Sequence, residues 1–143
     1  MTIDYEPVQK FEAMGLTVPY PDDPFELHNG PFYCGKNAEG NTVVTLEVGR
    51  TQCNSNLLVH GGCLMTLADL AVCYEAIDGD PEMRSVTVSL TANFLSPVDE
   101  GATLYAYPCV NRRTKRMAFV DVRIIDGEVV IFTGSAVIRV MPR

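Results

Sequence analysis

The sequence is short of positively charged residues. It has 11 lysines and arginines against 18 aspartates and glutamates, which gives a formal net charge of −7. Such a chain is poorly suited to bind nucleic acid or an anionic membrane surface, because both depend on extended basic patches. A site for an anionic ligand would need a local cluster of cations. We therefore expect neither a nucleic-acid partner nor a membrane partner.

Metal-ligand and disulfide patterns are also scarce. The chain has two histidines and five cysteines, an odd number without a C-x-x-C spacing. This composition favours reduced thiols over a secreted disulfide framework, and no paired Cys/His spacing indicates a zinc site. The N-terminus lacks the basic and apolar regions of a signal peptide. We expect a cytoplasmic protein that binds no metal.

The 143 residues are enough for one domain with one hydrophobic core. No low-complexity tract, internal repeat or linker divides the chain, so residues 1–143 are predicted to form a single domain. Residues 1–30 are predicted to cover this core with a short helix from Tyr5 to Met14 and an irregular, proline-rich loop. A short strand near Pro31–Cys34 follows, and His28 is interpreted as a loop residue.

The most apolar stretch, Cys63–Ile77, is predicted to be a buried helix because its apolar residues cover every face. It is too short and too interrupted to cross a bilayer. Asp69 lies inside it, and a buried carboxylate is normally paired, hydrogen-bonded or raised in pKa. Asp69 is therefore a candidate functional group. The alternative is that Asp69 caps a break in the helix or faces a solvent-filled gap between subunits.

The residues just before this helix, His60–Gly62, form a flexible turn whose backbone N–H groups could serve as an oxyanion hole. An ordinary glycine turn is the alternative. Gly61 and Asp69 lie about 12 Å apart along one helix at about 1.5 Å per residue, too far to reach the same carbonyl. Two antiparallel copies across a twofold axis would bring Gly61 of one chain beside Asp69 of the other. A catalytic pair therefore predicts an obligate dimer with shared sites.

Strands make up the rest of the predicted structure. One strand, Thr42–Val48, precedes the helix, and four follow it: Arg84–Leu95, Thr103–Val110, Met117–Ile125 and Val129–Val140. In the first of these four, alternation at period two is interpreted as one face made of Val86, Val88, Leu90, Ala92 and Phe94. An antiparallel sheet curled around the single helix, an α+β fold, is the economical arrangement.

Four features together resemble the hotdog-fold acyl-CoA thioesterases of the phenylacetate-pathway, or PaaI-like, group. They are Asn54 six places before a histidine, the H-G-G of His60–Gly62, the L-A-D of Leu67–Asp69 and the F-L-S-P of Phe94–Pro97. The resemblance implies an antiparallel sheet wrapped around one long central helix, a homodimer with a continuous sheet, and often a dimer of dimers. It also implies hydrolysis of acyl-CoA thioesters, with coenzyme A as part of the substrate and no cofactor.

The resemblance assigns catalytic roles to five residues. Asp69 matches the carboxylate that acts as nucleophile or as general base on water. Gly61 matches the backbone donor to the thioester oxygen, and Asn54 and His60 match residues that shape that corner. Thr87 occupies the strand position where some members carry a serine that helps to place the attacking water.

Contacts to the substrate or to CoA are assigned to Gly62, Ser96 and Pro97. The family usually carries glycine where this chain has Leu57, which affects the expected shape of the loop and the substrate range. A cationic cluster on the predicted connection between two strands could hold the CoA phosphates, or could be a solvated hairpin tip that discourages aggregation of sheet edges. This cluster consists of Arg112, Arg113, Lys115 and Arg116.

Three competing hypotheses remain. Cys53 or Cys63 could be the nucleophile, although a structural role is the better interpretation of both thiols. The chain could be a non-catalytic acyl-CoA binder or sensor, which would not need Asp69. It could also be a hydratase or dehydratase of the hotdog superfamily. The combination of Asn54, the H-G-G turn and Asp69 resembles the thioesterases more closely than these enzymes.

Overall fold

The computed structural model describes residues 6–143. No helix in this range is both long and apolar enough to cross a membrane. Four helical segments and six strands follow one another along the chain: α1 (Gln9–Ala13), α2 (Pro24–Asn29), β1 (Tyr33–Lys36), β2 (Thr42–Glu47), a 3-10 turn (Arg50–Gln52), α3 (Gly61–Ala76), β3 (Met83–Phe94), β4 (Thr103–Arg113), β5 (Met117–Asp126) and β6 (Val129–Pro142).

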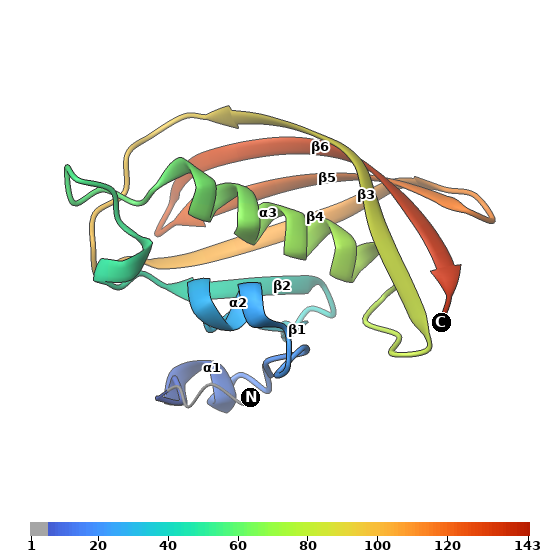
Figure 1. Cartoon of the computed structure of the whole chain (residues 1–143), viewed down its shortest axis with the longest axis horizontal. Coiled ribbons are helices and arrows are strands. Elements are labelled where there is room, and N and C mark those ends of the chain that lie inside the picture. Colours follow the sequence, from blue (N-terminus) through green and yellow to red (C-terminus); the bar gives the residue numbers. More distant parts are fainter. Residues whose placement is uncertain (1–5) are drawn as a thin grey trace.

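The six strands form one antiparallel sheet in the order β1-β2-β4-β5-β6-β3. Helix α3 lies across one face of this sheet (Figure 1). Its central residues Leu67, Ala68 and Ala71 are fully buried and share one core with Val44, Leu104 and Ile124 of the strands. The predicted α+β arrangement, a sheet curled around one apolar helix, is confirmed.

The predicted alternation of β3 is wrong in its first half. The pairing of β3 with β6 shifts register between Thr87 and Ser89, which is a β-bulge. Side chains before and after a bulge fall on opposite phases of the alternation. Val86 and Val88 are therefore 52% and 60% exposed, whereas Leu90 is packed against the core. The bulge also turns Thr87 toward α3.

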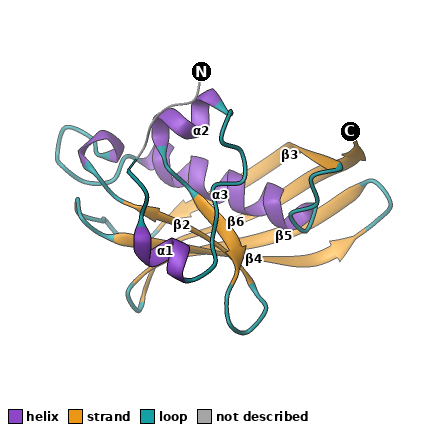
Figure 2. Cartoon of the chain, turned by 90° about the horizontal axis from the view of Figure 1, so that it is seen from below, coloured by secondary structure: helices purple, strands orange, loops and turns teal. Residues whose placement is uncertain are grey.

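The proline-rich segment contains a helix that the sequence analysis interpreted as irregular loop. Asp23 caps α2 by accepting hydrogen bonds from the backbone N–H groups of Phe25 and Glu26, and Pro24 occupies the first helical position. His28 consequently lies in the last turn of α2, not in a loop. Figure 2 shows α2 beside α3.

The first helix is shorter than predicted, and the Tyr5 end of the predicted range lies outside the described residues. Phe11 of α1 is fully buried in a second apolar cluster with Leu16, Tyr33 and Val43. Tyr105 packs against this cluster from the side of β4 that faces away from α3. The N-terminal segment thus covers one end of the outer face of the sheet with α1 and reaches α3 with α2.

Candidate active site

His60 caps the N-terminus of α3. Its Nδ1 accepts a hydrogen bond from the Gly62 N–H at 2.9 Å, so this side chain caps the helix. The Gly62 N–H is therefore occupied, which makes Gly62 unsuited as a second oxyanion donor. The Gly61 N–H, in contrast, has no acceptor among residues 6–143. One free donor lies at the positive end of the helix dipole, where a developing negative charge is stabilised.

Asn54 organises the loop that leads to this turn. Its Oδ1 accepts hydrogen bonds from the backbone N–H groups of Asn56 at 2.9 Å and Leu58 at 3.3 Å. The backbone N–H of Asn54 donates to the Leu58 carbonyl at 2.7 Å. The oxygen of the Asn54 side-chain amide thus holds the loop in place.

The backbone conformation at Leu57 is one that favours glycine. Its φ angle is 61°, in the left-handed region that leucine rarely adopts. Its side chain is 46% exposed, so little packing offsets the strain.

We expect Leu57→Asn to raise the free energy of unfolding by about 0.5–1 kcal/mol, since asparagine tolerates this conformation better. Leu57→Val should lower it by a similar amount, because a branched Cβ clashes there. Urea unfolding at a fixed protein concentration measures both. Equal effects of the two substitutions would show that backbone strain at this position is unimportant.

The segment after β3 runs beside the same loop. The Val59 N–H donates to the Val98 carbonyl at 2.8 Å, and the Phe94 ring lies 3.4 Å from where a Cβ on Gly61 would stand. This pairing brings the segment with Ser96 and Pro97 toward the N-terminal end of α3. Phe94 is 54% exposed and forms an apolar wall next to Gly61.

Asp69 is partly exposed and has a hydrogen-bond partner. Its Oδ1 accepts a hydrogen bond of 2.5 Å from the Thr87 hydroxyl, which the bulge in β3 directs toward it. The Thr87 oxygen lies 3.2 Å from Cys73 Sγ. Because the hydroxyl proton is used on Asp69, the thiol is the donor in this second contact. Cys73, Thr87 and Asp69 thus form a short hydrogen-bonded chain that orients the carboxylate.

We expect Thr87→Val to lower kcat about tenfold, since a hydrogen bond to a charged group contributes about 1.5–3 kcal/mol and here orients the carboxylate. Thr87→Ser keeps the hydroxyl and should retain most of the activity. Steady-state assays of both variants test this role. An equal loss in both variants would indicate packing instead.

A cavity of about 450 Å³ opens next to Asp69, between α2, α3 and β3. Its wall contains two further acidic residues, Asp23 and Glu26 of the α2 segment. Burial raises the pKa of Glu26 to about 7, and the neighbouring carboxylates of Asp23 and Asp69 add to this effect. Sequence reasoning missed Glu26 because it missed α2, although Asp23-Pro24 followed by Glu26 is a helix-start signal.

Not every side chain of the predicted cationic cluster is available to bind a ligand. β4 continues through Arg113, so Asn111–Arg113 belong to a strand and the connection is residues 114–116, which corrects the prediction. The Arg113 guanidinium donates to the carbonyls of Ala76 and Glu75 and so caps the C-terminus of α3. The remaining members Arg112, Lys115 and Arg116 are exposed.

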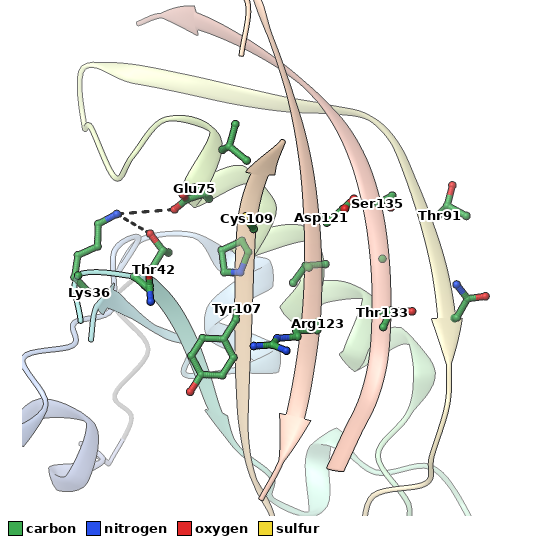
Figure 3. A pocket seen from close by; sticks show the side chains of 17 residues that line it. Lys36, Thr42, Glu75, Thr91, Tyr107, Cys109, Asp121, Arg123, Thr133 and Ser135 are labelled. Atoms are coloured by element: carbon green, nitrogen blue, oxygen red, sulfur yellow. Dashed lines mark hydrogen bonds and ion pairs between the residues drawn. The ribbon is translucent and has the colours of Figure 1, made fainter. Parts of the chain in front are cut away.

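A larger hollow of about 810 Å³ lies mainly on the face of the sheet that is turned away from α3. Figure 3 shows its polar lining, with Tyr107, Arg123 and Thr133 on successive strands and Lys36 and Glu75 at one end. None of the residues predicted from the sequence to form the site lines this hollow. It is therefore separate from the site around Asp69.

The cysteine alternative loses support. Burial raises the pKa of Cys63 to about 11, so its thiol stays protonated near neutral pH and is a poor nucleophile. Cys53 is half-buried, and its Sγ lies 3.5 Å from the Gly49 carbonyl. The surroundings of both thiols favour a structural role over a role as nucleophile.

One chain does not bring all the predicted catalytic residues together. Asn54, His60 and Gly61 gather at the N-terminus of α3, whereas Asp69 lies about two turns further along this helix, where Thr87 of β3 reaches it. The spacing of about 12 Å along a helix keeps the free Gly61 N–H away from the Asp69 carboxylate. A site that uses both groups must be completed by another chain.

Comparison with known proteins identifies relatives of this chain. The family model described as Thioesterase superfamily matches residues 57–132. “Putative esterase PA0474” of Pseudomonas aeruginosa is 35% identical over 109 residues, which are 76% of this chain and 81% of that protein. The acyl-coenzyme A thioesterase PaaI of Escherichia coli is 32% identical over 101 residues, 68% of this chain and 71% of that one.

The fold also has counterparts among solved structures. The PaaI protein from the phenylacetic acid degradation operon of Escherichia coli superimposes with a TM-score of 0.74 at 25% sequence identity. The match covers 93% of this chain and 91% of that chain. The structural match thus extends well beyond the residues of the family model.

Proposed function

Because this chain belongs to the thioesterase superfamily and has the hotdog fold of PaaI, we propose that it hydrolyses acyl-CoA thioesters with Asp69 and the Gly61 N–H of a partner subunit. One observation carries this assignment. Asp69 is held by Thr87 beside a cavity, while the Gly61 N–H remains free at a helix N-terminus. These two groups are a carboxylate for attack and a donor for the thioester oxygen.

In the reaction, the thioester oxygen accepts a hydrogen bond from the Gly61 N–H, and negative charge builds up on it as the carbonyl carbon is attacked. Asp69 either removes a proton from the attacking water or attacks directly and forms an anhydride that water then hydrolyses. The carbon–sulfur bond breaks, and the products are the free acid and coenzyme A. The chain formed by Cys73 and Thr87 keeps the carboxylate oriented in both routes.

The dimer that this mechanism needs is supported by the edge of the sheet. β3 pairs with β6 on one side only, and its other side is unpaired along 12 residues in the described chain. Its exposed Val86 and Val88 are unusual for an unprotected edge, which natural proteins normally charge or cover. Antiparallel pairing of two β3 strands would continue the sheet and set two α3 helices antiparallel. Further association into a dimer of dimers stays a prediction.

Coenzyme A carries several negative charges, so an acidic protein needs local cations to bind it. Arg112, Lys115 and Arg116 remain the proposed phosphate contacts, whereas Arg113 is engaged at the end of α3. Phe94 lies beside Gly61, and this residue together with Ser96 and Pro97, which follow it in the chain, is proposed to contact the substrate.

The experiment that tests this function is thiol release from a panel of acyl-CoAs, followed with a thiol-reactive chromophore. The panel contains arylacetyl, benzoyl and short-to-long aliphatic thioesters. Turnover of at least one class, together with a dimer in solution, is expected. Acyl-CoA binding in calorimetry without turnover of any substrate would instead favour the non-catalytic binder.

A further inference from the structure

The cavity beside Asp69 is asymmetric. One part of its wall is apolar and comes from Phe25, Met65, Leu70 and Leu90, while the other part carries Asp23, Glu26 and Asp69. The cavity is large enough for a small acyl group. An acyl chain that enters it from Asp69 must pass between an apolar surface and three carboxyl groups.

Glu26 differs from the other two acids in its contacts. Asp23 is fixed as the cap of α2 by two hydrogen bonds of 3.0 Å, and Asp69 accepts the hydrogen bond from Thr87. The Glu26 carboxyl group has no side-chain hydrogen bond and no ion pair within residues 6–143. It is therefore the acid in the wall that can respond directly to an occupant of the cavity.

The groups around Glu26 are acidic or neutral. Asp23 faces it from its own helix and Asp69 from α3, and both raise its pKa after burial, which is the largest cause. Burial raises the pKa of Tyr20 to about 12 and that of Cys73 above its ordinary value, so these neighbours stay uncharged near neutral pH. Cys34, whose thiol is also electrostatically coupled to Glu26, is kept protonated by burial in the same way.

We propose that Glu26 is a specificity-determining residue that makes this cavity reject acyl groups carrying a carboxylate and accept neutral ones. This inference rests on the proposed function, in which the acyl group of the CoA thioester occupies the cavity beside Asp69. A second carboxylate would enter a space whose wall, among the described residues, holds three acids and no cationic side chain, and like charges at short range are strongly disfavoured. A neutral chain keeps the contacts with the apolar wall.

The test compares glutaryl-CoA with 5-methylhexanoyl-CoA, in which an isopropyl group replaces the terminal carboxylate. The measured quantity is the ratio of kcat/KM for the two substrates, glutaryl over 5-methylhexanoyl. Glu26→Gln is expected to raise this ratio at pH 8 by about tenfold or more, because it removes an unpaired negative charge from the cavity wall. Glu128→Gln, an exposed residue in the turn between β5 and β6, changes the net charge equally and should leave the ratio unchanged.

The wild-type enzyme provides a second readout that needs no variant. Glu26 is neutral below its pKa of about 7 and charged above it, so the ratio should fall as the pH rises from 6 to 8. The carboxylate of glutaryl-CoA is ionised throughout this range and contributes no change. In Glu26→Gln the ratio should be independent of pH.

The outcomes separate the two proposals. If 5-methylhexanoyl-CoA is hydrolysed but the ratio neither falls with pH nor responds to Glu26→Gln, the role of Glu26 is wrong and the thioesterase function stands. If the wild type hydrolyses neither of these thioesters nor any other acyl-CoA of the panel, both proposals fail. A ratio that rises equally in Glu26→Gln and Glu128→Gln would indicate a general charge effect and would also overturn the role of Glu26.

Discussion

Replacing Asp69 with asparagine is expected to lower kcat for acyl-CoA hydrolysis by about 10³-fold, because the carboxamide can neither remove a proton from water nor attack the thioester. The two side chains have nearly the same shape, and the amide oxygen can still accept the hydrogen bond from the Thr87 hydroxyl. The fold and the cavity should therefore survive. Thiol release under saturating substrate measures the loss.

A control for this variant is acyl-CoA binding measured by calorimetry. The dissociation constant should change little, since the proposed contacts to CoA do not include Asp69. A variant that binds substrate and keeps wild-type turnover would remove Asp69 from the mechanism. The next candidate would then be a water positioned by Thr87 alone.

The second large effect is expected from Gly61→Pro, which removes the proposed oxyanion donor. Proline is well tolerated at the first position of a helix, and Gly61 holds this position in α3. His60 before it has φ −65° and ψ 134°, an extended conformation that suits a residue preceding proline. The substitution should thus delete one N–H group with little disturbance. We expect kcat to fall by about 10²–10³-fold, the usual cost of losing one oxyanion donor.

Gly61→Ala is the matched control for this variant. It keeps the N–H and adds only a Cβ, which would meet the Phe94 ring at an ordinary contact distance of 3.4 Å. The kcat of Gly61→Ala should stay close to that of the wild type and far above that of Gly61→Pro. Similar losses in the two variants would mean that crowding near Phe94, and not the missing donor, lowers the rate.

The central helix could be predicted from the sequence because its apolar residues leave no face for solvent. The same reasoning found Asp69 and Gly61 and their separation along α3. The bulge in β3 could not be predicted, since the sequence Val86-Thr87-Val88 alternates regularly and only the pairing with β6 reveals the shift. That shift decides that Thr87 faces Asp69.

Helix α2 was missed for a different reason. The segment that contains it was interpreted as an irregular loop because it is rich in proline, although Asp23 as a cap and Pro24 at the first position also start a helix. Without α2, Glu26 could not be placed near Asp69. The cap formed by His60 was equally hidden, because histidine is not among the usual capping residues.

The role of the cationic cluster depended on where a strand ends. The sequence predicted a connection that begins at Asn111, whereas the pairing of β4 with β5 continues to Arg113 opposite Ala118. Tertiary pairing thus extends the strand beyond its apolar part and delivers Arg113 to the carbonyls at the end of α3. Strand ends with polar residues carry little local signal for such an extension.

The most direct test of the shared site is the activity of purified mixed dimers. One dimer joins an Asp69→Asn chain to a Gly61→Pro chain, each with its own affinity tag, and one of its two shared sites is intact. It should recover about half of the wild-type kcat per dimer, although each parent is nearly inactive. The reference dimer joins a wild-type chain to a chain with both substitutions, and it should be nearly inactive because each shared site lacks one group. The opposite pattern, an inactive first dimer and a half-active reference dimer, would contradict the account and show that each chain carries a complete site.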